Sequence, residues 1–173
     1  MTALIPVITT KGLAAVWNAE NTGVAAKVTH IALGSNGYNP SKGQISLQAE
    51  KKRYQIADGQ RVSDTQIHVT ALADDGAAFW VREVGFYLED GTLFAVWASA
   101  TALAYKSELV PLLLAFDLVL DALPAGSVTV VGTGANLSLA AWGEQFAAQS
   151  AAIVDNMARH VDLLFRVMAL EKG

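Results

Sequence analysis

Two charged residues, Arg82 and Glu83, stand side by side inside an almost wholly apolar stretch that runs from Ala77 to Trp97. A buried acid beside a buried base could serve general acid–base catalysis. In an extended strand, however, neighbouring side chains point to opposite faces, so this pair cannot act on one substrate atom. A strand that is apolar on both faces is covered on both, and each charge then needs a partner within the fold or across a subunit interface. We therefore predict that Arg82 and Glu83 are structural ion-pair residues.

The other residues that could carry chemistry form no catalytic set. The histidines at positions 30, 68 and 160 are scattered, and the absence of cysteine excludes thiolate nucleophiles and cysteine-based zinc sites. The segment GTGANL, from Gly132, is similar to the first half of a dinucleotide-binding fingerprint, but Leu137 stands where the third glycine belongs. We expect a turn and the start of a helix there, and we predict no metal, no cofactor and no enzymatic activity.

The dipeptide Asp90-Gly91 is a strong hairpin signal and organises the apolar stretch around it. A two-residue loop, with positive φ at both positions, brings one face of the hairpin together. The expected cross-strand pairs on that face are Leu88–Leu93, Phe86–Ala95 and Val84–Trp97.

Further elements follow from periodicity. Thr9 or Thr10 caps a short helix over residues 11–20, with Leu13, Val16 and Trp17 on one face. Strands are expected over 27–33, 65–73 and 111–123, and residues 127–131 return as the second strand of another hairpin. Residues 47–61 are ambiguous between a short helix and an edge strand. The pattern predicts an α+β fold with a mostly antiparallel sheet.

Composition narrows the classes of partner. Hydrophobic residues make up 53% of the 173 residues and charged residues 16%, against about 25% in an ordinary soluble domain. Such an apolar chain favours an oligomer or a part of a larger assembly. The net charge of −4 argues against nucleic acid, and no apolar run approaches the ~20 residues of a membrane span. The N-terminal residues show no signal-peptide pattern.

From Ser138 the apolar period changes to that of a helix of about 34 residues, roughly 50 Å long. One seam repeats every seven residues at positions 146, 153, 160 and 167. The second seam is either 149, 156, 163 and 170, or 150, 157, 164 and 171. Such a helix associates with copies of itself, or alternatively folds back on the sheet. The predicted interface residues are Phe146, Gln149, Ile153, Asn156, His160, Leu164 and Val167.

The ordered motifs resemble the N-terminal attachment domain of the phage tail-collar fibre family, from contractile-tailed phages. The specific part is FWVREVGFYLEDGTLFAV, residues 79–96. An early T-x-x-G helix start, the strand-to-loop segment HIALGSNG and the Tyr105-Lys106 pair accompany it, so that the resemblance covers roughly residues 1–133.

This resemblance implies a structural virion protein without enzymatic activity, made in the cytoplasm of the host bacterium. Residues 1–135 would be an attachment domain that docks on the baseplate proteins of a contractile tail or tail-like particle. Residues 136–173 would form a trimeric coiled coil, the stalk of a homotrimer. Because the family's usual long shaft and receptor-binding tip do not follow, we expect a short fibre, or an adaptor for a distal tail fibre protein. The alternative is a small carbohydrate- or ligand-binding β-domain that uses Trp80, Trp97 and Tyr38 as stacking surfaces.

Overall fold

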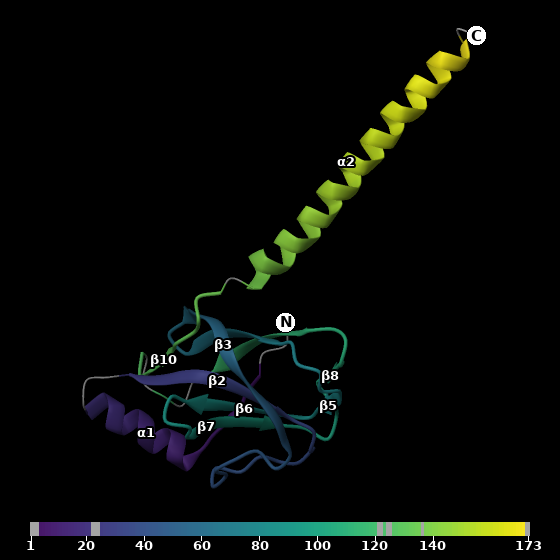
Figure 1. The fold of residues 1–173 in the computed structure, drawn as a ribbon. Helices are drawn as coiled ribbons and strands as arrows, with labels where there is room; N and C mark the ends of the chain where they lie inside the picture. The colour runs from purple at the N-terminus through teal and green to yellow at the C-terminus, as the bar shows by residue number, and fades with distance from the viewer. Residues whose placement is uncertain (1–3, 22–24, 121–122, 124–125, 136, 172–173) are drawn as a thin grey trace. The chain divides into compact units, whose positions relative to one another are not determined.

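The computed structural model describes residues 4–21, 25–120, 123, 126–135 and 137–171, with the side chains of 18–21 and 137–148 outside the description. The chain divides into two compact units, Met1–Ala135 and Asn136–Gly173. The first unit is α+β with a curled, mostly antiparallel sheet, and the second contains a long helix (Figure 1).

In its described residues, the first unit contains a helix and strands that range from two to fourteen residues in length. They are β1 (Val7–Ile8), α1 (Thr10–Asn21), β2 (Ala26–Gly34), β3 (Glu50–Ser63), β4 (Gln66–Ala73), β5 (Phe79–Val81), β6 (Glu83–Leu88), β7 (Leu93–Ala98), β8 (Ala104–Lys106), β9 (Leu112–Val119) and β10 (Val128–Val130). The second unit contains α2 (Leu137–Glu171).

Among the described residues, eight strands form one sheet, in which seven follow the order β1-β7-β6-β2-β3-β4-β9 and β10 pairs with β2. Strands β5 and β8 form a separate ribbon, which lies at the opposite end of the unit from α1 (Figure 1). The ambiguous segment is the long strand β3, whose first half pairs with β2 and whose second half pairs with β4.

The prediction of a hairpin between the last two strands is wrong. Strand β9 pairs with β4 over its whole length, and β10 runs parallel to β2 instead. Two glycines allow this approach: a side chain at Gly59 would overlap Val130, and a Cβ at Gly132 would lie 2.5 Å from the carbonyl oxygen of Ala57. Close backbone packing of this kind is not visible in local sequence periodicity.

The N-terminal segment connects the two edges of the curled sheet. Leu4 forms a parallel bridge with Leu118 of β9, and its N–H donates to the carbonyl of Asp117 at 3.1 Å. Pro6 has no N–H with which to continue this ladder. The next two residues pair with β7 as strand β1. Residues 4–8 therefore cross from β9 at one edge of the sheet to β7 near the other.

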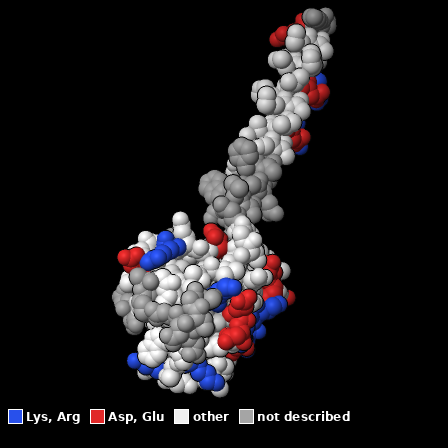
Figure 2. Space-filling view, turned by 90° about the vertical axis from the view of Figure 1, so that its left-hand side faces the viewer, with Lys and Arg blue, Asp and Glu red and all other residues white. Residues whose placement is uncertain are grey.

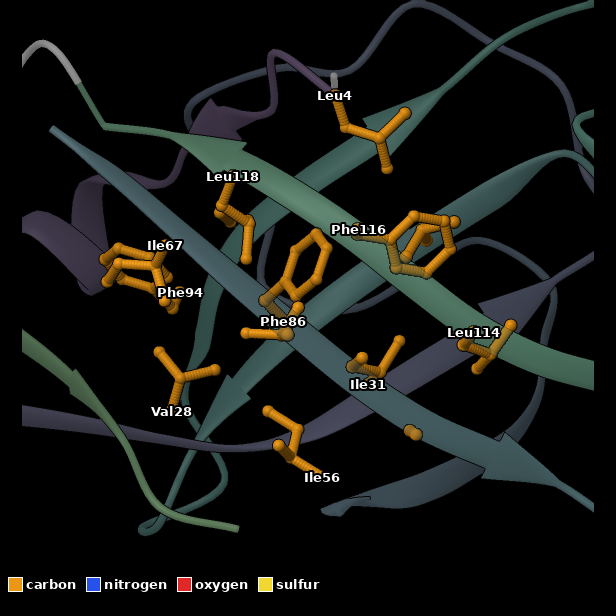
Figure 3. Close-up of a cluster of buried hydrophobic side chains, with 14 of the residues drawn as sticks. Leu4, Val28, Ile31, Ile56, Ile67, Phe86, Phe94, Leu114, Phe116 and Leu118 are labelled. Atoms are coloured by element: carbon orange, nitrogen blue, oxygen red, sulfur yellow. The ribbon is translucent and has the colours of Figure 1, made fainter. Parts of the chain in front are cut away.

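The core fills the inside of the curl (Figure 3). Phe86 of β6 and Phe116 of β9 meet edge to face, with ring centroids 6.2 Å apart. The alternation expected for residues 111–123 is confirmed, because Leu114, Phe116, Leu118 and Leu120 are all buried. A second, smaller cluster on the outer face of β6 and β7 contains Ala32, Leu47, Tyr87, Leu93 and Val96.

Helix α1 covers the segment expected to be helical and lies against β7 (Figure 1). Thr9 is the N-cap, since its hydroxyl accepts a hydrogen bond from the N–H of Gly12 at 2.9 Å. Val16 is fully buried and Leu13 partly buried. Trp17 shares this face of the helix by its spacing but is 56% exposed.

The β6–β7 hairpin forms where the sequence predicts it, and the pairs Val84–Trp97 and Phe86–Ala95 are confirmed. Its tip differs. The N–H of Gly91 donates to the carbonyl of Leu88, and Gly91 has φ of 83° while Asp90 does not adopt positive φ. The loop therefore has three residues, a turn followed by a left-handed glycine, and the predicted Leu88–Leu93 pair is replaced by Tyr87–Leu93.

Candidate functional site

Glu83 is fully buried on the outer face of β6, beneath the loop that joins β2 to β3. Its carboxylate accepts hydrogen bonds from the N–H of Gln48 at 2.9 Å, the N–H of Ala49 at 2.7 Å and the hydroxyl of Tyr38 at 2.9 Å. A longer contact of 3.5 Å joins it to the N–H of Asn36. One carboxylate thus ties down both ends of the loop.

The surroundings of Glu83 leave no room for other side chains. A Cβ at Gly34 would lie 2.6 Å from the carboxyl carbon of Glu83, so glycine is required at this point of β2. Burial, together with the hydrogen bond to Glu83, raises the pKa of Tyr38 to about 12, although the hydrogen bond from Gln44 opposes the rise. The Tyr38 hydroxyl therefore stays protonated and donating at neutral pH.

Arg82 interrupts the strand between β5 and β6. Its N–H donates to the carbonyl of Gly34 at 3.0 Å, and its carbonyl accepts from the N–H of Ser99 at 2.9 Å. The alternation of faces expected for Arg82 and Glu83 fails. Val81 and Val84, which flank them and are three residues apart, both face the core. Arg82 is therefore half-buried on the outer side rather than in the core.

The predicted ion pairs are not found among the residues that the structure describes. Neither Arg82 nor Glu83 forms a salt bridge to any residue that the structure describes. For Glu83 the reason is that neutral backbone amides and a hydroxyl satisfy the carboxylate. For Arg82 a partner in another subunit or another protein stays a prediction.

A second polar network lies beside the first. The hydroxyl of Tyr87, which is buried, donates to Glu50 at 2.9 Å, and the guanidinium of Arg53 lies 3.5 Å from the centroid of the Tyr87 ring. Arg53 also donates to both oxygens of Glu50, at 2.7 and 3.2 Å. Burial and the hydrogen bond to Glu50 raise the pKa of Tyr87 to about 12. The network fastens the start of β3 to the hairpin.

Lys106, the last residue of β8, is fully buried. Its ammonium donates to the carbonyls of Asp75 and Ser107, both at 2.6 Å, and lies 3.5 Å from the Asp75 carboxylate. Lys52 at 3.3 Å and the hydroxyl of Tyr54 at 2.9 Å also reach that carboxylate. Burial alone would raise the pKa of Asp75, but the hydrogen bonds and the two ammonium groups outweigh it, and the pKa is lowered.

The three aromatic residues of the carbohydrate-binding alternative do not gather on one surface. Trp97 is half-buried and packs against the core, and Tyr38 is half-buried with its hydroxyl on Glu83. Trp80 is 54% exposed, and its aromatic neighbour is Tyr105, with ring centroids 4.9 Å apart. Sequence reasoning missed Tyr105 as a partner because the β5–β8 pairing joins distant segments.

A groove of about 400 Å³ opens where the N-terminal segment leaves β9 for β7. Apolar side chains line most of it, and the charged residue on its described wall is Lys42. No histidine or carboxylate of the described residues lines this groove, so it offers no acid–base pair. Within the same residues, no cluster of histidine, aspartate and glutamate could hold a metal ion.

Helix α2 has two contrasting faces. Ile153, Val154, Met157, Val161, Leu164 and Met168 lie along one side and are all exposed. The opposite side carries Asp155 and Arg159, an ion pair at 2.8 Å, followed by Asp162 and Arg166. Figure 2 shows red and blue atoms together on one side of the helix, and mostly uncharged atoms with a red group near the tip on the other. No described helix is long and apolar enough to cross a membrane.

The predicted seam residues fall differently on these faces. At 100° per residue, Ile153 and Leu164 belong to the apolar side and His160 lies at its edge. Val167, Gln149 and Asn156 lie on the flank. Phe146 lies outside the described side chains. The helix geometry therefore favours the second of the two seams, which contains Met157 and Leu164.

A comparison with protein families matches residues 1–111, more than half of the chain, to the model described as phage tail-collar fibre protein, N-terminal. No curated protein and no solved structure matches the chain.

Proposed function

Because the chain belongs to the phage tail-collar fibre family, we propose that it is a structural, non-enzymatic component of a virion tail that fastens a fibre to the baseplate. The first unit docks on baseplate proteins of a contractile tail or tail-like particle. The second unit assembles three copies into a coiled coil. The family match over residues 1–111 is the observation that carries the proposal.

The polar groups of the first unit suit a rigid docking body better than a catalyst. Among the residues whose burial is described, Glu83 and Lys106 are the two buried charged side chains, and both bond mainly to backbone groups of loops. Such groups are engaged in holding the loops in place. A body with its loops fixed in advance binds a partner without the entropic cost of ordering them.

The second unit supports assembly. A single helix buries none of the apolar side chains on its stripe, and several long apolar residues of α2 are about half exposed or more. Residues of opposite charge occupy the other face, as in a coiled coil whose outer surface meets water. We place Val161 and Leu164 at the centre of the trimer, with His160 at its edge. The distal end of the helices is the place for a further tail fibre protein.

Sedimentation equilibrium tests the assembly. We expect a mass of three chains for residues 1–173, held over a wide concentration range, and a mainly monomeric species for residues 1–135. Val161→Asp should dissociate the trimer. Leu163→Asp is the matched control, since the two residues are 51% and 55% exposed in the single chain but lie on different faces. A monomeric full-length chain contradicts the proposal, and dissociation by Leu163→Asp alone favours the other seam.

A further inference from the structure

We propose that Trp80, Arg82 and Tyr105 form the surface through which the first unit grips its partner, and that the partner presents a carboxylate flanked by apolar side chains. We call these three residues the aromatic–arginine surface. This inference rests on the proposed function and names the contact that docking uses.

The aromatic pair stands out as exposed apolar area on a structured ribbon. Trp80 and Tyr105 are directly opposite each other in the β5–β8 pairing, and they are 54% and 49% exposed. Their rings contact at 4.9 Å with planes tilted by 54°. Each therefore restricts the rotamers of the other, so a partner that covers them pays little side-chain entropy.

Arg82 adds a directed charge. Phe79 and Val81 are buried, so Trp80 and Arg82, which alternate with them, both lie on the outer side of this segment. The guanidinium has no hydrogen bond or ion pair with any described residue, while its backbone is held on both sides by Gly34 and Ser99. A half-buried cation that pairs with no described carboxylate of its own chain is complementary to a carboxylate on another protein.

Two residues of the surface are each followed directly by a buried anchor of the unit. Glu83 follows Arg82 directly and ties the β2–β3 loop, and Lys106 follows Tyr105 directly and ties the segments at Asp75 and Ser107. These anchors fix the backbone that presents the three side chains. The buried charges of Glu83 and Lys106 thereby pre-organise the aromatic–arginine surface, and a pre-organised surface binds its partner more tightly.

A protein partner fits this surface better than a sugar or a second copy of the chain. Tryptophan, tyrosine and arginine are the residues that dominate binding energy at protein interfaces. Sugar sites need several convergent polar groups beside the aromatic ring. Among the described side chains, Arg82 is the polar group that we can place on this surface. The acidic net charge of the chain also disfavours burying its own carboxylates against another copy.

The experiment uses tail particles purified from a strain in which the gene for this protein is deleted. Full-length protein is added back, and its affinity for the particles is measured by sedimentation or interferometry. We expect Trp80→Ala to weaken binding by about 30-fold or more, as at a hot spot. Trp17→Ala is the matched control, because Trp17 is 56% exposed on α1 at the other end of the unit, and its effect should stay within about twofold.

Arg82→Gln provides an independent arm. It should weaken binding about tenfold at low salt and reduce the salt dependence of the affinity, and Arg82→Lys should restore part of both. Equal binding by wild type, Trp80→Ala and Arg82→Gln overturns the inference while leaving the proposed function intact. No binding by the wild type refutes the proposed function. Two further outcomes also overturn the inference. If Trp80→Ala lowers the mass of the trimer, the surface contacts another copy of the chain. If host oligosaccharides quench the tryptophan fluorescence of the wild type but not of Trp80→Ala, the surface binds a sugar.

Discussion

Replacing Glu83 with glutamine tests whether the buried carboxylate holds the β2–β3 loop in place. The substitution keeps the size and shape of the side chain but turns one acceptor oxygen into a donor. Three short hydrogen bonds, from Gln48, Ala49 and Tyr38, converge on the carboxylate. The Tyr38 hydroxyl can rotate and accept, whereas an amide N–H cannot. In the variant, the N–H of Gln48 or of Ala49 therefore meets the donating side-chain NH₂ group of glutamine, and the other N–H donates to a neutral oxygen instead of a charged one.

The magnitude follows from these contacts. Hydrogen bonds to charged groups contribute about 1.5–3 kcal/mol, against about 1 kcal/mol for neutral ones, and a buried unsatisfied donor costs about 1–3 kcal/mol. The neutral amide is easier to desolvate, which offsets part of the loss. We expect Glu83→Gln to lower the free energy of unfolding by about 2–4 kcal/mol.

Urea unfolding and hydrogen exchange provide the assay. The amides of Gln48 and Ala49 should exchange faster in the variant, while amides in the β6–β7 hairpin keep their order of protection. Glu89→Gln is the control, because its ion pair with Lys27 spans 3.6 Å at an exposed position and contributes under about 1 kcal/mol. If Glu83→Gln changes the free energy of unfolding by less than about 0.5 kcal/mol and leaves both amides protected, the Glu83 carboxylate does not hold the β2–β3 loop in place.

Three further predictions use the same unfolding measurement. Lys106→Met should cost about 2–4 kcal/mol because two part-buried carbonyls lose the donor that the buried ammonium supplies. Lys52→Met, at a 53% exposed side chain, should cost under about 1 kcal/mol, and equal effects of the two substitutions would contradict the role assigned to Lys106. The pKa values of Tyr38 and Tyr87 are raised from 10.0 to about 12, so their contribution is complete below about pH 10 and is lost as the pH rises toward 12. Stability should fall across that range, less steeply in Tyr87→Phe, and a flat profile would count against the buried network. Thr9→Ala should cost about 1–2 kcal/mol through loss of the cap of α1, and an unchanged midpoint would show that the cap is not needed.

Local patterns in the sequence were sufficient for the elements that depend on neighbouring residues. The alternation of residues 111–123 predicts the buried face of β9, and Asp90-Gly91 predicts the position of the β6–β7 hairpin. The length of the hairpin loop was not predictable in the same way, because Asp-Gly fits both a two-residue turn and a turn ending in a left-handed glycine.

Features that depend on distant segments were missed. The parallel pairing of β10 with β2 relies on close approaches at Gly59 and Gly132, and no local pattern specifies them. The partners of Glu83 are mainly backbone amides, which have no residue signature, so the sequence predicted an ion pair where the structure has amide and hydroxyl donors. Tyr105 and Trp80 meet through a ribbon whose strands are more than twenty residues apart.

Cryo-electron microscopy of purified tail particles would locate this protein directly on the assembled tail. We expect three copies per fibre, with residues 4–135 seated on the baseplate, the aromatic–arginine surface covered by a tail protein, and three α2 helices wound together. Particles that lack the protein altogether, or that carry it as single copies, would show that it is not a trimeric tail attachment protein.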